Sequence, residues 1–134
     1  MAKELPKRSE VKLENTWKLE DMYATLEEWG ADVVKIRNLV EELETMKGSL
    51  RKSAGNLYRA LNLSVEIDKT INLAANYAHR ASDVDTKNNE NQAKVQRIMA
   101  ITVESMSRLA FLEPEALGVS RDQLEEFIKE AGAR

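Results

Sequence analysis

Apolar side chains recur at steps of three and four residues along most of the chain, which is the spacing of one face of an α-helix. The first segment of this kind starts at Thr25, which forms a capping box with Glu28. Its apolar positions are Leu26, Trp29, Val33, Ile36, Val40 and Leu43. Lys47 followed by Gly48 is typical of a helix end. The pattern therefore predicts a long helix over residues 25–47.

Two further segments with the same spacing follow. The first has its apolar or small positions at Leu57, Leu61, Ser64, Ile67, Ile71, Ala74 and Ala78, and the second has them at Val95, Ile98, Ile101, Thr102 and Leu109. Ser53 caps the first segment, which we expect to form a helix over residues 53–82. The second should form a helix over residues 86–112, because the residue before Pro114 avoids helical backbone angles.

The corner between these two helices holds short polar side chains, which bond nearby backbone groups and so end one helix and cap the next. They are Ser82, Asp83, Asp85 and Thr86. A connection this short makes its flanking helices antiparallel and places them in contact. The sequence therefore predicts a long helical hairpin.

The two ends of the chain do not predict long helices. Residues 1–24 are expected to form an extended arm, and anchoring to the bundle is favoured over a ligand-stacking role for Trp17, because burying an indole contributes about 2–3 kcal/mol. A capping box from Ser120 to Gln123 predicts a short helix over residues 120–131. The predicted fold is all-α, with residues 1–134 as one antiparallel bundle of three long helices, an extended N-terminal arm and a short C-terminal helix.

Composition narrows the classes of function. The chain has no cysteine, which excludes disulfides and thiolate chemistry. A net charge of −3 without a basic block argues against nucleic acid as a partner. No stretch is long and apolar enough to span a membrane, and the charged N-terminus lacks the apolar segment of a secretory signal. We therefore expect a soluble protein of the cytoplasm.

The residues that could carry chemistry have better structural explanations. His79 is the only histidine, so it lacks the partners that a zinc site or a nucleophilic triad needs, and a hydrogen-bonded packing role is favoured. A calcium loop starting at Asp83 would have Lys87 at its fifth position and Lys94 at its twelfth, where oxygen ligands are required. Lys87, Lys94 and Arg97 are interleaved with acidic residues and are interpreted as ordinary surface charge. We predict no catalytic, cofactor-binding or metal-binding residue in this chain.

Three motifs in order resemble the N-terminal region of oligoendopeptidase F, a family of zinc metallopeptidases. The motifs are Leu5-Pro6-Lys7-Arg8-Ser9-Glu10 followed by Thr16-Trp17-Lys18-Leu19-Glu20-Asp21-Met22-Tyr23, then Tyr77-Ala78-His79 with Asp83, Asp85, Thr86 and Asn88, and lastly Phe111-Leu112-Glu113-Pro114-Glu115. The resemblance covers nearly the whole chain. The family binds zinc through a His-Glu-x-x-His helix and a later Glu, and no position here matches either motif.

The resemblance implies a division of labour between two parts of an enzyme. The N-terminal helical domain would be a lid or wall of the substrate channel, which admits only short peptides, and a separate catalytic domain would hold the zinc. The implied partners are that missing catalytic domain and the oligopeptide substrates. The alternative is a standalone helical interaction module derived from the family. In either case, an apolar strip exposed by the missing partner should favour a homodimer of the isolated chain.

Overall fold

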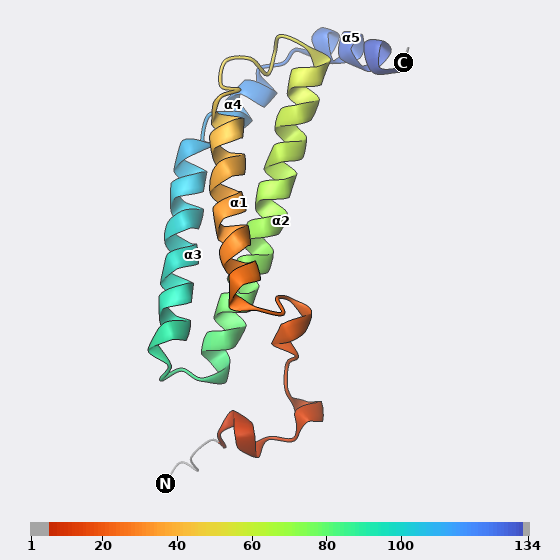
Figure 1. Cartoon of the computed structure of the whole chain (residues 1–134). Coiled ribbons are helices and arrows are strands. Elements are labelled where there is room, and N and C mark those ends of the chain that lie inside the picture. The colour runs from red at the N-terminus through yellow and green to blue at the C-terminus, as the bar shows by residue number, and fades with distance from the viewer. Residues whose placement is uncertain (1–5, 133–134) are drawn as a thin grey trace.

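The computed structural model describes residues 6–132, so the first five residues of the predicted arm and the last two of the predicted domain lie outside it. Within that range α1 (Leu26–Glu44), α2 (Ala54–Val84) and α3 (Asn89–Arg108) lie side by side as a bundle (Figure 1). Two shorter helices follow, α4 (Leu112–Leu117) and α5 (Arg121–Gly132). The described residues form no strand, and the all-α prediction is confirmed.

Helix α1 begins where its capping residues predict. The Thr25 hydroxyl accepts a hydrogen bond from the Glu28 backbone N–H at 3.2 Å. The Glu28 carboxylate accepts one from the N–H of Ala24, one residue earlier than the capping box requires. The predicted apolar seam is buried except at its first position, Leu26, which is half exposed. The helix ends at Glu44, and the chain then turns through Gly48, whose φ is +80°.

The α2–α3 hairpin has the predicted antiparallel form, but its corner is longer than expected. Ser53 caps α2 by accepting from the Asn56 N–H at 3.1 Å. Helix α3 begins after Asn88, whose side chain accepts from the backbone N–H groups of Glu90 and Asn91. A side-chain amide that satisfies two free N–H groups is a strong start signal, so α3 begins later than residue 86. The Asn91 amide also donates to the Ala81 carbonyl at 2.9 Å and joins the two helices.

The core combines small side chains of α2 with larger ones of its neighbours. Ala74 and Ala78 have no exposed surface, and the indole of Trp29, which is 2% exposed, packs beside them. The Trp29 Nε1 donates a hydrogen bond to the Ala74 carbonyl at 3.0 Å, so its one polar atom is satisfied within the core. Further along, branched side chains such as Ile36 and Ile98 are fully buried. None of the helices within residues 6–132 is long and apolar enough to cross a membrane.

The third helix differs from its predicted end. It stops at Arg108, and the chain turns at Leu109 before α4 begins. Pro114 lies in the first turn of α4, where its missing N–H would have no helical partner in any case. It therefore belongs to the start of a helix and does not end the previous one. Ser120 caps α5 by accepting from the Gln123 N–H at 3.2 Å, as the sequence predicts.

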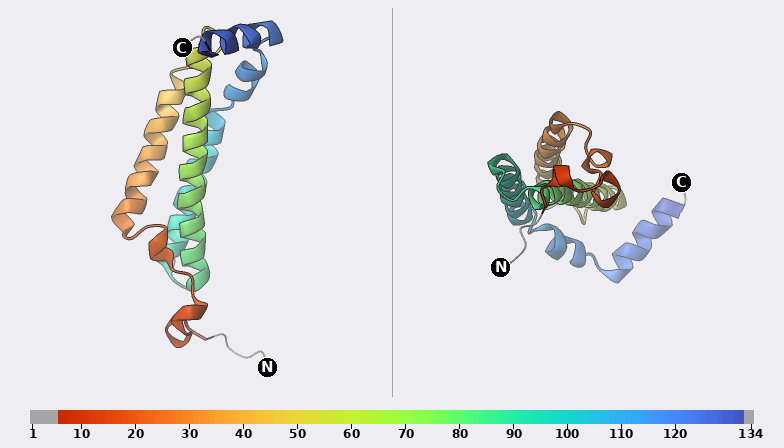
Figure 2. Two further views of the ribbon diagram at one scale, coloured as in Figure 1. Left: turned by 90° about the vertical axis from the view of Figure 1, so that its right-hand side faces the viewer. Right: turned by 90° about the horizontal axis from the view of Figure 1, so that it is seen from below.

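The N-terminal arm forms three short 3₁₀ turns, Arg8–Glu10, Leu13–Asn15 and Leu19–Asp21, of which the last contacts α2 and the first two lie beyond the end of the bundle (Figure 1). Its buried contact is Tyr23, which is 6% exposed and packs edge-on against Tyr77 with ring centroids 5.2 Å apart. Trp17 is 70% exposed, so the expectation that it anchors the arm by burial is wrong. At the other end, α4 and α5 project from the side of the bundle opposite α1 (Figure 2).

Candidate functional site

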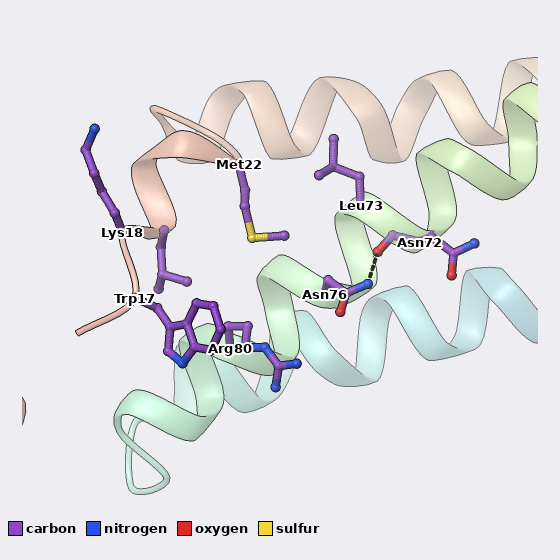
Figure 3. Close-up of a pocket in the computed structure, with 8 residues that line it drawn as sticks. Trp17, Lys18, Met22, Asn72, Leu73, Asn76 and Arg80 are labelled. Carbon is purple, nitrogen blue, oxygen red and sulfur yellow. Dashed lines mark hydrogen bonds between the residues drawn. The ribbon is translucent and has the colours of Figure 1, made fainter. Parts of the chain in front are cut away.

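A pocket of about 520 Å³ lies between the N-terminal arm and α2 (Figure 3). The arm contributes Trp17, Lys18, Leu19 and Met22, and α2 contributes Asn72, Leu73, Asn76 and Arg80. The α2 residues recur at steps of three and four, so they lie along one outward face of that helix. The arm reaches this face because Tyr23, directly after Met22, is fixed in the core.

The two cationic side chains of the pocket already have acidic neighbours. Arg80 lies over the Trp17 ring, 5.7 Å from its centroid, and its guanidinium is 3.4 Å from an Asp83 carboxylate oxygen. Lys18 binds Asp21 at 2.6 Å, and this hydrogen bond raises the pKa of the Lys18 amine. The pocket therefore has little net positive charge to offer a ligand.

The amide side chains of the pocket offer acceptors. Asn72 and Asn76 each use their N–H₂ group to donate to the carbonyl four residues earlier, both at 2.8 Å. Their Oδ1 atoms keep the capacity to accept hydrogen bonds from a ligand. The lining contains no hydroxyl, thiol, carboxylate or imidazole, and its one amine, that of Lys18, is bound to Asp21. These features suit an apolar group flanked by N–H donors.

The described residues do not fit a zinc ion. No group of three or more His, Asp or Glu side chains within residues 6–132 is placed to hold a metal. Asp83 lies against Arg80, and Asp85 accepts from the Lys87 backbone N–H at 3.1 Å. His79 is exposed, so the packing role predicted for it is wrong.

The predicted surface cations divide into two kinds. Lys94 lies over the Tyr77 ring at 5.9 Å, and Arg97 lies over the Trp29 ring at 5.6 Å. Lys94 is half-buried and Arg97 is exposed, so both are surface side chains that lie over aromatic rings, whereas Lys87 is exposed at the hairpin corner. The face formed by Asn72, Asn76 and Arg80 was not predicted from the sequence. Their regular spacing of four residues was the available signal.

Relatives of known name align with almost the whole chain but with little of their own length. Oligopeptidase PepF of Bacillus subtilis (strain 168) is 36% identical over 129 residues, which are 96% of this chain and 19% of that protein. A plasmid-encoded oligoendopeptidase F of Lactococcus lactis subsp. cremoris is 30% identical over 126 residues, 92% of this chain and 21% of its own length. The resemblance to oligoendopeptidase F is confirmed.

The match extends to a third named relative of the same kind. Group B oligopeptidase PepB of Streptococcus agalactiae is 28% identical over 92% of this chain and 20% of its own length. The chain thus spans about a fifth of the length of the curated relatives that it matches. No protein-family model and no solved structure matches it. The similarity to oligoendopeptidase F therefore concerns one helical segment of much longer proteins.

Proposed function

We propose that this chain is the non-catalytic N-terminal helical domain of an oligoendopeptidase F-like zinc metallopeptidase of the cytoplasm. The observation that carries the proposal is the alignment of 96% of the chain with 19% of Bacillus subtilis oligopeptidase PepF. A whole folded bundle thus corresponds to a part of a larger protein. The remaining part would supply the metal ligands and hydrolyse short peptides.

In this proposal the domain is a lid or wall of the substrate channel. A channel wall excludes substrates that are too wide for the channel, so it must keep its shape when a peptide binds. Long helices packed through fully buried residues such as Val33, Ile36 and Ile98 suit this role, because close-packed interiors deform little. The pocket beside Trp17 adds a surface that can contact a peptide without reacting with it.

A chimeric enzyme tests this function. The segment of Bacillus subtilis oligopeptidase PepF that aligns with this chain is replaced by the chain itself, and cleavage of a short fluorogenic peptide is compared with cleavage of a long unfolded polypeptide. We expect a folded chimera that cleaves the short peptide and strongly prefers it. A folded chimera without activity, or one that cleaves both substrates equally well, would contradict the proposal.

The chain by itself provides the complementary test. Incubated with zinc and the short peptide, it should release no product, because the described residues offer no set of metal ligands. Zinc-dependent hydrolysis that a chelator abolishes would show that the chain is catalytic. A variant His79→Ala, which removes the only histidine, would then reveal whether that side chain takes part.

A further inference from the structure

Six of the large apolar side chains that the α2–α3 hairpin exposes form two regular lines. On α2 they are Tyr58, Leu61 and Val65, which are 72%, 46% and 50% exposed. On α3 they are Met99, Val103 and Met106, which are 55%, 67% and 70% exposed. Within each line the residues are three or four positions apart, so each line runs along one side of its helix. These six residues are called the open face below.

Both lines lie on the side of the hairpin that is turned away from α1. On α2 the side chains that reach α1 are Arg59, which binds Glu42, and Glu66, which binds Lys35. With about 100° per residue, Leu61 and Val65 lie roughly 110–150° around the helix from this direction, and Tyr58 lies roughly 90° from it. On α3 the corresponding contacts are made by Arg97 and Arg108, and its apolar line is roughly 130–170° away from them.

The two lines meet at one level of the bundle and extend from it in opposite directions. The hydrogen bond between Asn91 and Ala81 fixes the antiparallel register, which places Met106 near the level of Val65. Packed helices have axes about 8–10 Å apart, so side chains at one level on the same side of two neighbours form one surface. The open face is therefore a diagonal apolar strip that passes from α2 to α3 where Val65 and Met106 meet.

One end of this surface is bounded by the C-terminal helices. α4 lies on the side of the bundle opposite α1, and α5 continues from it near the start of α2 (Figure 2). The hydrogen bond from Gln123 to the Arg51 carbonyl, at 2.8 Å, fixes the start of α5 against the loop before α2. Leu117 and Ile128 add exposed apolar side chains, 77% and 70% exposed. The open face thus lies on α2 and α3, and α4 and α5 lie at one of its ends.

We propose that the open face is the docking surface for the larger, catalytic part of an oligoendopeptidase F-like protein. This inference rests on the proposed function and adds the place of contact. The relatives that match this bundle are about five times longer than the matched segment, so in them a similar bundle is joined to a larger body. Contiguous apolar surface of this kind marks a protein contact site, because single domains seldom expose it to water.

The test introduces a charge into the open face of the chimera. Val103→Glu places a carboxylate in the centre of the α3 line, and Val34→Glu is the matched control, since Val34 is a half-exposed valine on the outer side of α1. We expect Val103→Glu to lower peptidase activity at least tenfold and to split one unfolding transition into two. Val34→Glu should change activity less than twofold. Leu61→Glu, on the other helix of the open face, should act like Val103→Glu.

The isolated chain shows whether a loss comes from docking or from misfolding. At concentrations where the isolated chain is monomeric, neither Val103→Glu nor Val34→Glu should change its helix content or melting temperature, because both positions are exposed in the bundle. Equal effects of the two variants on a chimera that stays folded would overturn the docking surface. A second pair of results would also overturn it: Val103→Glu leaves the chimera unaffected but dissociates a homodimer of the isolated chain. The open face would then bind a second copy of the chain and not the catalytic part. A folded but inactive parent chimera with a single transition would overturn the proposed function and still support docking.

Discussion

Tyr23 attaches the N-terminal arm to the bundle by packing and by one hydrogen bond. Its hydroxyl donates to the Asp32 carboxylate at 2.7 Å, and its ring is 6% exposed. Tyr23→Phe keeps the ring and removes the bond to a charged acceptor, so we expect a loss of about 1–2 kcal/mol in the free energy of unfolding. Urea denaturation measures this loss. Tyr58→Phe is the control, because Tyr58 is 72% exposed and its loss should be negligible.

Tyr23 should also make the free energy of unfolding depend on pH in the alkaline range. Burial, together with the hydrogen bond to Asp32, raises the pKa of the Tyr23 phenol well above its ordinary value of 10.0. The folded protein therefore holds this proton more tightly than the unfolded chain does, and the resulting stability is complete below pH 10 and is lost as the pH rises further. The free energy of unfolding should fall more steeply above pH 10 for the parent than for Tyr23→Phe. Parallel curves for the two proteins would contradict this assignment.

Single residues were predicted well where a helical seam decides their burial, and poorly where it does not. Trp17 lies outside any seam, and its large ring suggested burial, yet the arm's 3₁₀ turns leave it on the surface. His79 follows the fully buried Ala78 directly and is therefore turned about 100° away from the core. Which side chain of the arm reaches the core depends on the backbone path of the arm. That path is irregular, so it leaves no periodic pattern in the sequence from which burial could be predicted.

Two glycines have opposite roles in the elements that contain them. Gly30 lies inside α1, and an added Cβ there would meet nothing within 4 Å. Gly30→Ala should stabilise the chain by about 0.5–1 kcal/mol. Gly48 has a φ of +80° in the turn after α1, and Gly48→Ala should destabilise it by about 1–2 kcal/mol. Thermal unfolding of both variants should shift in opposite directions, and shifts of the same sign would refute the explanation.

An ion pair joins the last turn of α1 to the end of α3. The Arg108 Nε donates to the Glu44 carboxylate at 3.0 Å, and this hydrogen bond lowers the pKa of Glu44 below its ordinary value of 4.5. A lowered folded pKa means that the stabilisation is present above pH 4.5 and is lost as the pH falls through the folded value. Glu44→Gln should therefore show a weaker acid dependence of the free energy of unfolding than the parent. Glu126→Gln, on the exposed side of α5, should retain the parent's dependence.

At the scale of elements, the sequence predicted the middles of the helices better than their ends. The seams placed all three long helices because a stripe of buried side chains leaves a clear period. The ends depend on single capping groups that compete with one another. Asn88 displaced the start of α3 from the expected corner residues, and Pro114 proved to belong to a new helix. Both are side chains that can end one helix or begin another, so the sequence leaves two solutions open.

For the whole molecule, the sequence could not tell which apolar line would remain uncovered. Helix α3 carries one line through Ile98 and Ile101, which is buried, and another through Met99, Val103 and Met106, which is exposed. Both have helical spacing, so periodicity alone does not separate them. The difference arises from the position of α1, which covers only one side of the hairpin. The surface that we assign to docking is thus a property of the assembled bundle and becomes visible only in three dimensions.

An uncovered apolar surface also predicts how the isolated chain behaves in solution. With no larger body to cover it, the open face can bury its side chains only against a second copy, so we expect reversible self-association that strengthens with concentration. Sedimentation velocity over a concentration series should show the dimer, and Val103→Glu should weaken it because pairing would bury a carboxylate. Val34→Glu, which leaves the open face unchanged, should associate like the parent. If the parent chain remains monomeric at millimolar concentration, exposing this face to water has no measurable free-energy cost. That result would also count against the docking surface.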